Sequence, residues 1–216
     1  MNRVELVTNR GRIKALLGIL KLNDEEAYRH SVDVAKITEM YLEEEERSGV
    51  KSRPDEEKCS IIAGALLHDI GKGFLPFGLQ YSTRTFTETE QEIMKMHPLL
   101  GAVAVKDCEV DKIVENIILM HHANLDGTGY PRINNMSYGT DILVPEYVWI
   151  VSYADKLDAM ISRRSFKRQK SLSEAWDVLV SMSREGKLPY ENLGIYRKII
   201  SNMDIFKVKP LEMPKI

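Results

Sequence analysis

The spacing of the apolar residues restricts the fold of this chain more than any other feature of its sequence. Between residues 12 and 22 the intervals are three and four, which predicts a helix whose apolar face is made of Ile13, Leu16, Leu17, Ile19 and Leu20. Similar spacing continues along the chain, whereas strand-like alternation with crossovers and repeats of fixed length are missing from the sequence. We therefore predict an all-α fold, a helical bundle.

Capping residues and helix breakers set the expected limits of the other helices. Asp24 offers an N-cap before two acidic residues, which suit a first turn because the helix dipole favours negative charge there. Thr87 caps a helix that Pro98 should kink or break, and Pro145 suits the first turn of another helix. The predicted helices span residues 24–46, 55–69, 87–97, 111–122, 145–162, 171–184 and 190–203, with loops at residues 73–85 and 123–143.

The length and composition fit one domain and exclude several classes of protein. Within 216 residues we expect a helix over 1–22, a core over 23–186 and a C-terminal helix of the same domain over 187–216. The 30 Lys and Arg residues against 32 Asp and Glu residues predict neither a nucleic acid polymer nor a membrane as partner. The longest apolar run, residues 61–67, is too short to cross a bilayer. Two isolated cysteines and a start without a signal peptide predict a cytoplasmic protein.

The five histidines of the chain stand in contexts that suggest a metal site. A single histidine is more often a core or surface residue than a ligand, and that interpretation applies to each of them alone. The pair His68 and Asp69 is different, because it follows the apolar run on a helix that must be largely buried. A buried carboxylate is costly unless it is paired or bound to a cation. Imidazole and carboxylate are ligands of the divalent metals that activate water, so the sequence predicts a metal at this pair.

Four short motifs lie along the chain. They are His68-Asp69-Ile70-Gly71-Lys72, His97-Pro98-Leu99-Leu100-Gly101, the segment from His121 to Pro131 that contains Gly129-Tyr130-Pro131, and Ala154-Asp155-Lys156-Leu157-Asp158-Ala159-Met160. Together they resemble the motifs of the HD superfamily of metal-dependent phosphohydrolases, and in particular those of its HD-GYP subgroup. They occur in the family's order and at compatible spacing, and the resemblance covers about residues 24–179.

This resemblance implies an all-α hydrolase of the bacterial second messenger cyclic di-GMP, with pGpG or GMP as its product. It also implies two or three divalent metal ions, most often iron or manganese. Asp69 would be the bridging carboxylate, and Glu26 would be the extra ligand of a third ion. The complete set of implied metal ligands is Glu26, His30, His68, Asp69, His97, His121, His122 and Asp155.

The resemblance further assigns residues to catalysis and to substrate binding. Asp69 and Lys72 would be catalytic, and Lys72 would lie beside the scissile phosphate. A solvated basic stretch is an equally weighted interpretation of Arg164 and Lys167. The implied substrate contacts are Lys72, Asp126, Gly129, Tyr130, Asp158, Arg164 and Lys167.

Two positions depart from the family pattern, and two other functions stay open. Ala123 stands where a Glu usually follows the paired histidines, and Ser165 replaces a common Pro. Ala123 is not an implied ligand, so metal binding should survive. One alternative is hydrolysis of another cyclic dinucleotide or of a nucleotide. The other is a non-catalytic module that senses the dinucleotide or docks on a protein partner, such as a diguanylate cyclase or a separate sensory protein.

Overall fold

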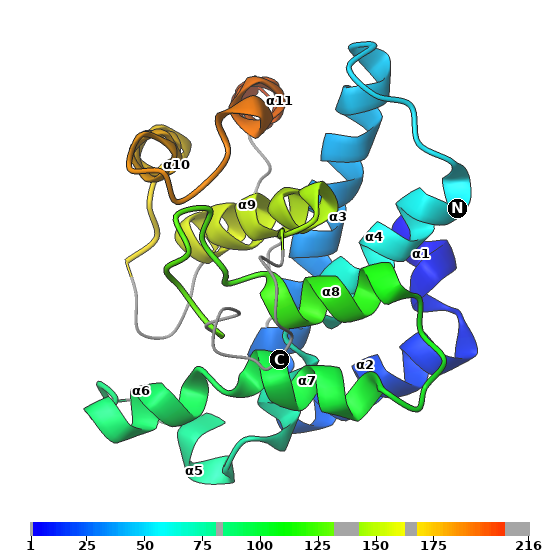
Figure 1. The fold of residues 1–216 in the computed structure, drawn as a ribbon, viewed down its shortest axis with the longest axis vertical. Helices are drawn as coiled ribbons and strands as arrows, with labels where there is room; N and C mark the ends of the chain where they lie inside the picture. The colour runs from blue at the N-terminus through cyan, green and yellow to red at the C-terminus, as the bar shows by residue number, and fades with distance from the viewer. Residues whose placement is uncertain (1, 81–83, 132–142, 163–167, 206–216) are drawn as a thin grey trace, which may run out of the picture.

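The computed structural model describes residues 2–80, 84–131, 143–162 and 168–205, and it is predominantly helical (Figure 1). These residues form no strand, and their one isolated β-bridge joins Ala123 to Gly129. The predicted all-α fold is confirmed. The helices are α1 (Arg3–Thr8), α2 (Gly11–Asn23), α3 (Glu25–Arg47), α4 (Asp55–Leu67), the 3-10 helix η1 (Ile70–Phe74), α5 (Phe77–Gln80), α6 (Glu88–Met94), α7 (His97–Val105), α8 (Lys112–Met120), α9 (Glu146–Ile161), α10 (Leu172–Arg184), the 3-10 helix η3 (Tyr190–Asn192) and α11 (Leu193–Ile205).

The long helix α3 organises the bundle, because it packs against both α4 and α9. Its first turn is fixed as predicted, since the Asp24 carboxylate accepts a hydrogen bond of 2.8 Å from the Ala27 amide. On the other side α4 packs against α8, and α10 and α11 cover α9 and α3 (Figure 1). The elements that carry the histidine and aspartate motifs therefore meet in the middle of the bundle.

Helix α4 is buried along most of its length, and this burial places the His68–Asp69 pair in the interior. Ile61, Ile62 and Leu66 are fully buried, and each such side chain stabilises the fold by about 1.5–3 kcal/mol. Gly64 permits the close approach of α8, since a Cβ atom there would lie 2.5 Å from the Ile117 side chain. The chain that leaves α4 is thus held within the core and not at the surface.

The structure adds short helices where the sequence predicted none. Residues 1–22 contain α1 as well as α2, and the predicted loop at residues 73–85 contains α5. Such short elements offer too few apolar positions to show a period. The predicted break at Pro98 occurs just before it, because Pro98 is the second residue of the new helix α7. None of the described helices has the length and apolar character needed to cross a bilayer.

Candidate metal centre

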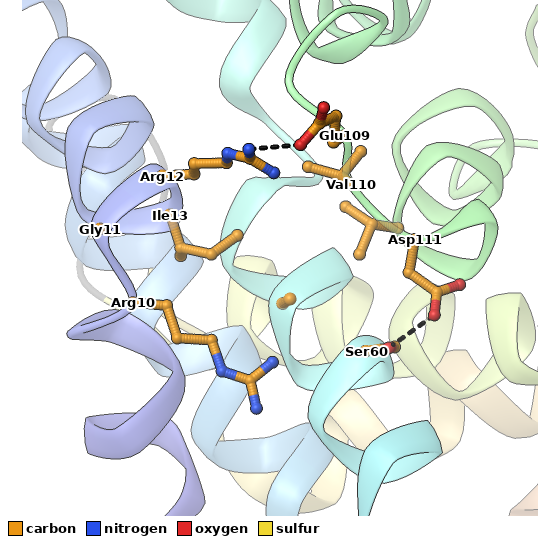
Figure 2. Close-up of a pocket in the computed structure, with 10 residues that line it drawn as sticks. Arg10, Gly11, Arg12, Ile13, Ser60, Glu109, Val110 and Asp111 are labelled. Carbon is orange, nitrogen blue, oxygen red and sulfur yellow. Dashed lines mark hydrogen bonds and ion pairs between the residues drawn. The ribbon is translucent and has the colours of Figure 1, made fainter.

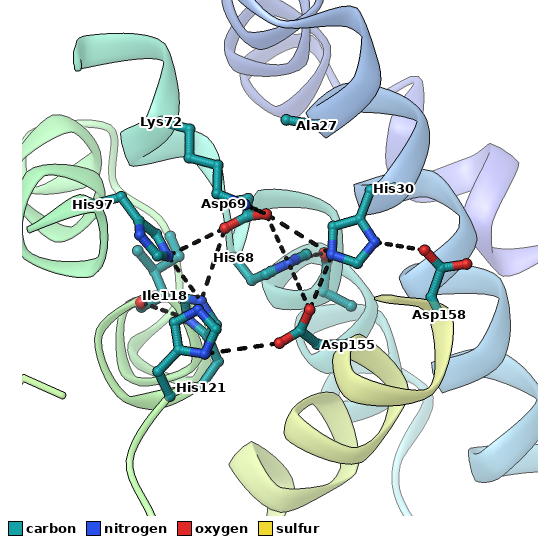
Figure 3. Close-up of polar contacts among 12 residues, drawn as sticks. Ala27, His30, His68, Asp69, Lys72, His97, Ile118, His121, Asp155 and Asp158 are labelled. Carbon is teal, nitrogen blue, oxygen red and sulfur yellow. Dashed lines mark hydrogen bonds and ion pairs between the residues drawn. The ribbon is translucent and has the colours of Figure 1, made fainter. Parts of the chain in front are cut away.

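Five elements bring seven of the eight predicted ligands to one place (Figure 3). Helix α3 supplies His30 and α9 supplies Asp155, while the other ligands lie at the end of α4, the start of α7 and the end of α8. Their ligand atoms form two groups, and within each group they lie within 4.8 Å of one another. The first group is Asp69, His97, His121 and His122, and the second is His30, His68 and Asp155.

Asp69 lies between the two groups, and its two oxygens face different histidines. Oδ1 is 3.2 Å from His97 Nε2 and 3.9 Å from His121 Nε2. Oδ2 is 3.4 Å from His68 Nε2 and 3.8 Å from His30 Nε2. A carboxylate in this position can serve a metal ion in each group, which is the bridging role that the resemblance implied.

A close approach of η1 to α7 sets the distance between Asp69 and His97. A Cβ atom on Gly71 would lie 1.8 Å from the His97 carbonyl oxygen and 2.6 Å from the Gly101 amide nitrogen. Only glycine fits at this position, because both neighbouring atoms belong to the backbone and cannot swing aside. Gly71 of the first motif and Gly101 of the second therefore lie at the contact where η1 approaches α7.

Three histidines are held in the same tautomer by backbone carbonyls three residues earlier in the chain. Nδ1 of His68 donates to the Ala65 oxygen at 2.8 Å, Nδ1 of His97 donates to the Met94 oxygen at 2.8 Å, and Nδ1 of His121 donates to the Ile118 oxygen at 2.9 Å. A carbonyl oxygen only accepts, so Nδ1 carries the proton and Nε2 of the neutral ring carries a lone pair. This arrangement is typical of metal-binding histidines, whose second nitrogen is fixed by an outer partner.

Two of the donor atoms that face the centre lack hydrogen-bond partners. They are His68 Nε2 and Asp69 Oδ1, which are buried and accept no hydrogen bond from the described part of the chain. His97 Nε2 and His121 Nε2 lie 3.2 Å apart, so two lone pairs face each other when both rings are neutral. Unsatisfied buried polar atoms are costly. Divalent cations would satisfy these atoms, and imidazole with carboxylate is a donor set that suits them.

His30 is held from both sides by carboxylates of α9. Its Nε2 lies 2.9 Å from Asp155 Oδ1 and its Nδ1 lies 2.6 Å from Asp158 Oδ2. Burial opposes a charge on His30, but the hydrogen bonds to Asp155 and Asp158 outweigh burial and raise its pKa to about 9. Asp158 also accepts from the Ser162 hydroxyl at 2.6 Å. The structure thus places Asp158 behind His30, where it orients the ring, although the resemblance implied a substrate contact.

Four further ligands have the charge states that metal binding needs. Burial would raise the pKa of the Asp69 carboxyl, but the charge of Lys72 holds that pKa well below its usual range. Burial would also raise the pKa of the Asp155 carboxyl, but chiefly the hydrogen bond with His30 holds that pKa well below its usual value. Burial lowers the pKa of His122 to about 3 and that of His121 well below its usual value. At neutral pH these groups are therefore carboxylates and neutral imidazoles.

Lys72 and the loop after His122 lie at the edge of the centre. Lys72 Nζ is 2.5 Å from Asp69 Oδ2, and the lysine side chain is 22% exposed. The Tyr130 ring lies 4.6 Å from the His122 ring. Gly129 has a φ of +89°, and a Cβ atom there would lie 2.3 Å from the His122 oxygen, so glycine allows the loop to fold back on the histidine.

The remaining predicted residues do not lie among the ligands. Glu26 is exposed and belongs to neither ligand group, although it precedes His30 by one turn. Asp126 is exposed, and its carboxylate accepts from the Thr128 amide at 2.9 Å, which shapes the loop. Arg164 and Lys167 lie outside the described residues.

Several groups that orient the ligands were not predicted from the sequence. They are the carbonyl groups of Ala65, Met94 and Ile118 and the hydroxyl of Ser162. The shared spacing of three residues was a usable signal for the carbonyl groups, because it places an acceptor within reach of the histidine that follows.

A pocket of about 320 Å³ lies elsewhere, between the start of α2, α4 and the connection from α7 to α8 (Figure 2). An ion pair of Arg12 with Glu109 and a hydrogen bond of Ser60 with Asp111 cross its rim. None of the predicted metal or substrate residues lines it.

Comparisons with known sequences identify relatives of this chain. It is 34% identical to a cyclic di-GMP phosphodiesterase of Thermotoga maritima, over 76% of this chain and 42% of the relative. It is 32% identical to a cyclic di-GMP phosphodiesterase of Pseudomonas aeruginosa, over 74% of this chain and 37% of the relative. The chain thus spans about two fifths of the length of these curated relatives.

Two solved structures share the fold of this chain, and a family model matches its sequence. The HD domain of the L. monocytogenes phosphodiesterase PgpH, solved with cyclic-di-AMP, superposes with a TM-score of 0.65 at 16% identity, over 92% of this chain and 100% of that chain. An HDG"Y"P protein from Bdellovibrio bacteriovorus superposes with a TM-score of 0.60 at 24% identity, over 81% of this chain and 52% of that chain. A model of the HD domain family matches residues 27–160. Because this match spans more than half of the chain, the protein belongs to the HD domain family, as its motifs predicted.

Proposed function

We propose that this protein is a metal-dependent phosphodiesterase that hydrolyses cyclic di-GMP to pGpG or GMP. The observation that carries the proposal is the pair of ligand groups with Asp69 between them, in which His68 Nε2 and Asp69 Oδ1 are buried without a hydrogen-bond partner. The named activity of the relatives from Thermotoga maritima and Pseudomonas aeruginosa supports the same substrate. The Gly129-Tyr130-Pro131 sequence beside His122 supports membership of the HD-GYP subgroup.

Most of the site residues would hold the metal ions, and Lys72 would lie beside the phosphate. Two divalent ions would neutralise phosphoryl charge and lower the pKa of water, which are the two needs of phosphodiester hydrolysis. His97, His121 and His122 would hold one ion, and His30, His68 and Asp155 would hold the other. Asp69 would serve both. The Lys72 ammonium, at the rim and 2.5 Å from Asp69 Oδ2, is placed to hold a proton and a positive charge beside a phosphate.

Iron and manganese are the first candidates for these ions, because both accept imidazole together with carboxylate. A third ion at Glu26 is part of the proposal only if that exposed side chain turns towards His30, one turn further along α3. Arg164 and Lys167 as substrate contacts, and a diguanylate cyclase or a sensory protein as partner, stay predictions.

A second candidate substrate is another cyclic dinucleotide. The chain is 25% identical over 152 residues to a 3′3′-cGAMP-specific phosphodiesterase of Vibrio cholerae, and the PgpH domain was solved with cyclic-di-AMP. The same histidine ligands would serve the hydrolysis of any of these cyclic dinucleotides. Only a comparison of the substrates in an assay therefore separates the candidates.

A hydrolysis assay tests the proposal. Protein purified without oxygen, with its metal content counted, would be given cyclic di-GMP, 3′3′-cGAMP and cyclic di-AMP, with the Asp69→Asn variant beside it. We expect metal-dependent release of pGpG or GMP that the variant loses. Turnover of a different cyclic dinucleotide alone would favour the second candidate. No turnover of any dinucleotide by fully metallated protein would contradict both and favour a binding module.

A further inference from the structure

Lys156 is a partly buried cation that forms no ion pair with a carboxylate in the described part of the chain. It follows the ligand Asp155 on α9, and its Nζ donates a long hydrogen bond of 3.4 Å to the Ser152 carbonyl oxygen. Throughout the described ranges, no carboxylate oxygen lies within 4.0 Å of this nitrogen, which is the limit for an ion pair. A desolvated ammonium without a negative partner is costly to keep.

Other cations that the fold withdraws from solvent are treated differently. Arg53 lies 2.7 Å from Glu45, and Lys58 lies 2.6 Å from Glu46. At the metal centre itself, Lys72 contacts Asp69. In each case an acidic residue of the chain offsets the desolvation of the cation. Lys156 differs from these cations, because among the described residues no carboxylate lies within ion-pair distance of its ammonium.

The position of Lys156 on α9 directs it towards the edge of the metal centre. Ser152, one turn earlier on the same face of the helix, donates from Oγ to the His121 carbonyl oxygen at 2.7 Å. Its neighbour Asp155 has Oδ2 at 3.8 Å from His122 Nδ1. Burial is the main cause of the low pKa of His122, and the charge of Lys156 contributes to it. Lys156 therefore lies on the face of α9 whose Ser152 contacts His121.

We propose that Lys156 is a specificity-determining residue that binds the phosphate of a cyclic dinucleotide that is not being cleaved. This inference rests on the proposed function. A cyclic dinucleotide carries two phosphate anions, and the metal centre with Lys72 takes the scissile one. The second anion then needs a cation a short distance from the centre, and Lys156 offers one that no described carboxylate contacts. A lysine suits this purpose because its ammonium acts as a compact point charge on a flexible stem.

Two neutral variants, a charge-conserving variant and two substrates test this inference. Lys156→Gln and Lys156→Met remove the charge and keep much of the stem, whereas Lys156→Arg keeps the charge. Lys106→Gln, an exposed lysine at the end of α7, is the matched control. Cyclic di-GMP has two phosphates and bis(p-nitrophenyl) phosphate has one. A KM change that is confined to cyclic di-GMP and depends on the charge at position 156 therefore points to the second phosphate.

Both neutral variants should raise the KM for cyclic di-GMP, relative to that for bis(p-nitrophenyl) phosphate, by roughly tenfold to a hundredfold, as expected for a lost hydrogen bond to a charged group. Lys156→Arg should recover most of the loss, the effect should fall on KM more than on kcat, and Lys106→Gln should match the wild type. An unaltered KM ratio in both neutral variants would overturn the assignment of Lys156 alone. A wild-type protein that cleaves bis(p-nitrophenyl) phosphate but no cyclic dinucleotide would overturn the proposed function, and this inference with it.

Discussion

Raising the pH should tighten metal binding at the His30 group, because the metal must displace a proton from His30. In the metal-free protein, Asp155 and Asp158 raise the pKa of His30 to about 9, so the ring is protonated at neutral pH. A metal binds only the neutral imidazole. Removing the His30 proton costs about 1.4 kcal/mol of metal-binding free energy for each pH unit below its pKa, which is about 2 kcal/mol at about pH 7.5. Between about pH 7.5 and 8.5 the affinity should rise close to tenfold.

Titration calorimetry of metal-free protein with Mn²⁺, in buffers with different enthalpies of protonation, measures this proton directly. At about pH 7.5 we expect close to one proton released for each ion bound by the His30 group. His121 and His122 should add none, because their lowered pKa values keep them neutral. The variant His30→Gln should lose the release, and Arg29→Gln, on the exposed side of the same helix turn, should retain it. Equal release from wild type and His30→Gln, or none from the wild type, would refute the reasoning.

Three further predictions follow from the same geometry. Replacing Asp158 by Ala removes the acceptor behind His30 and should weaken Mn²⁺ binding about tenfold to a hundredfold by calorimetry, whereas Asp177→Ala on the exposed side of α10 should not. Gly71→Ala places a Cβ atom 1.8 Å from the His97 oxygen and should destabilise the protein by about 3 kcal/mol in urea unfolding, whereas Gly18→Ala meets nothing within 4 Å and should not destabilise it. The free energy of unfolding of the metal-free protein should fall by up to about 3 kcal/mol as the pH rises from 6.5 through about 9. The reason is that Asp155 and Asp158 stabilise only the protonated form of His30. An unfolding free energy that does not change over this pH range would contradict the prediction.

The fold could be predicted where the helices are long and their limits are marked by side chains. Asp24 and Thr87 cap α3 and α6 as expected. The break between α6 and α7 falls just before Pro98. The short helices α1 and α5 could not be predicted, because one or two turns give no period that distinguishes them from a loop. Their positions depend on packing against distant parts of the chain, which the sequence does not show.

The identities of the clustered ligands could be predicted, but the way they are held could not. Resemblance named His30, His68 and Asp155, and the structure brings them together. It also implied a substrate contact for Asp158, which the structure places behind His30 at 2.6 Å. A motif records which residue types recur and not which atoms they face, so orientation emerged only from the packing of α9 against α3.

The exposed position of Glu26 has a similar explanation. Residues four apart share one face of a helix, so Glu26 and His30 were expected to reach one cluster. His30 is buried, whereas Glu26 is exposed near the start of α3. The spacing fixes a common face but not how far along the helix the neighbouring elements cover it.

The measurement that tests the central claim most directly is a stepwise metal titration followed by hydrolysis. Metal-free protein would receive Mn²⁺ or Fe²⁺ in fractions of an equivalent, and the release of product from cyclic di-GMP would be recorded at each step. The two ligand groups that share Asp69 predict that activity appears fully only when about two ions are bound to each chain. Full activity with one ion for each chain, or hydrolysis by protein stripped of metal, would contradict the account.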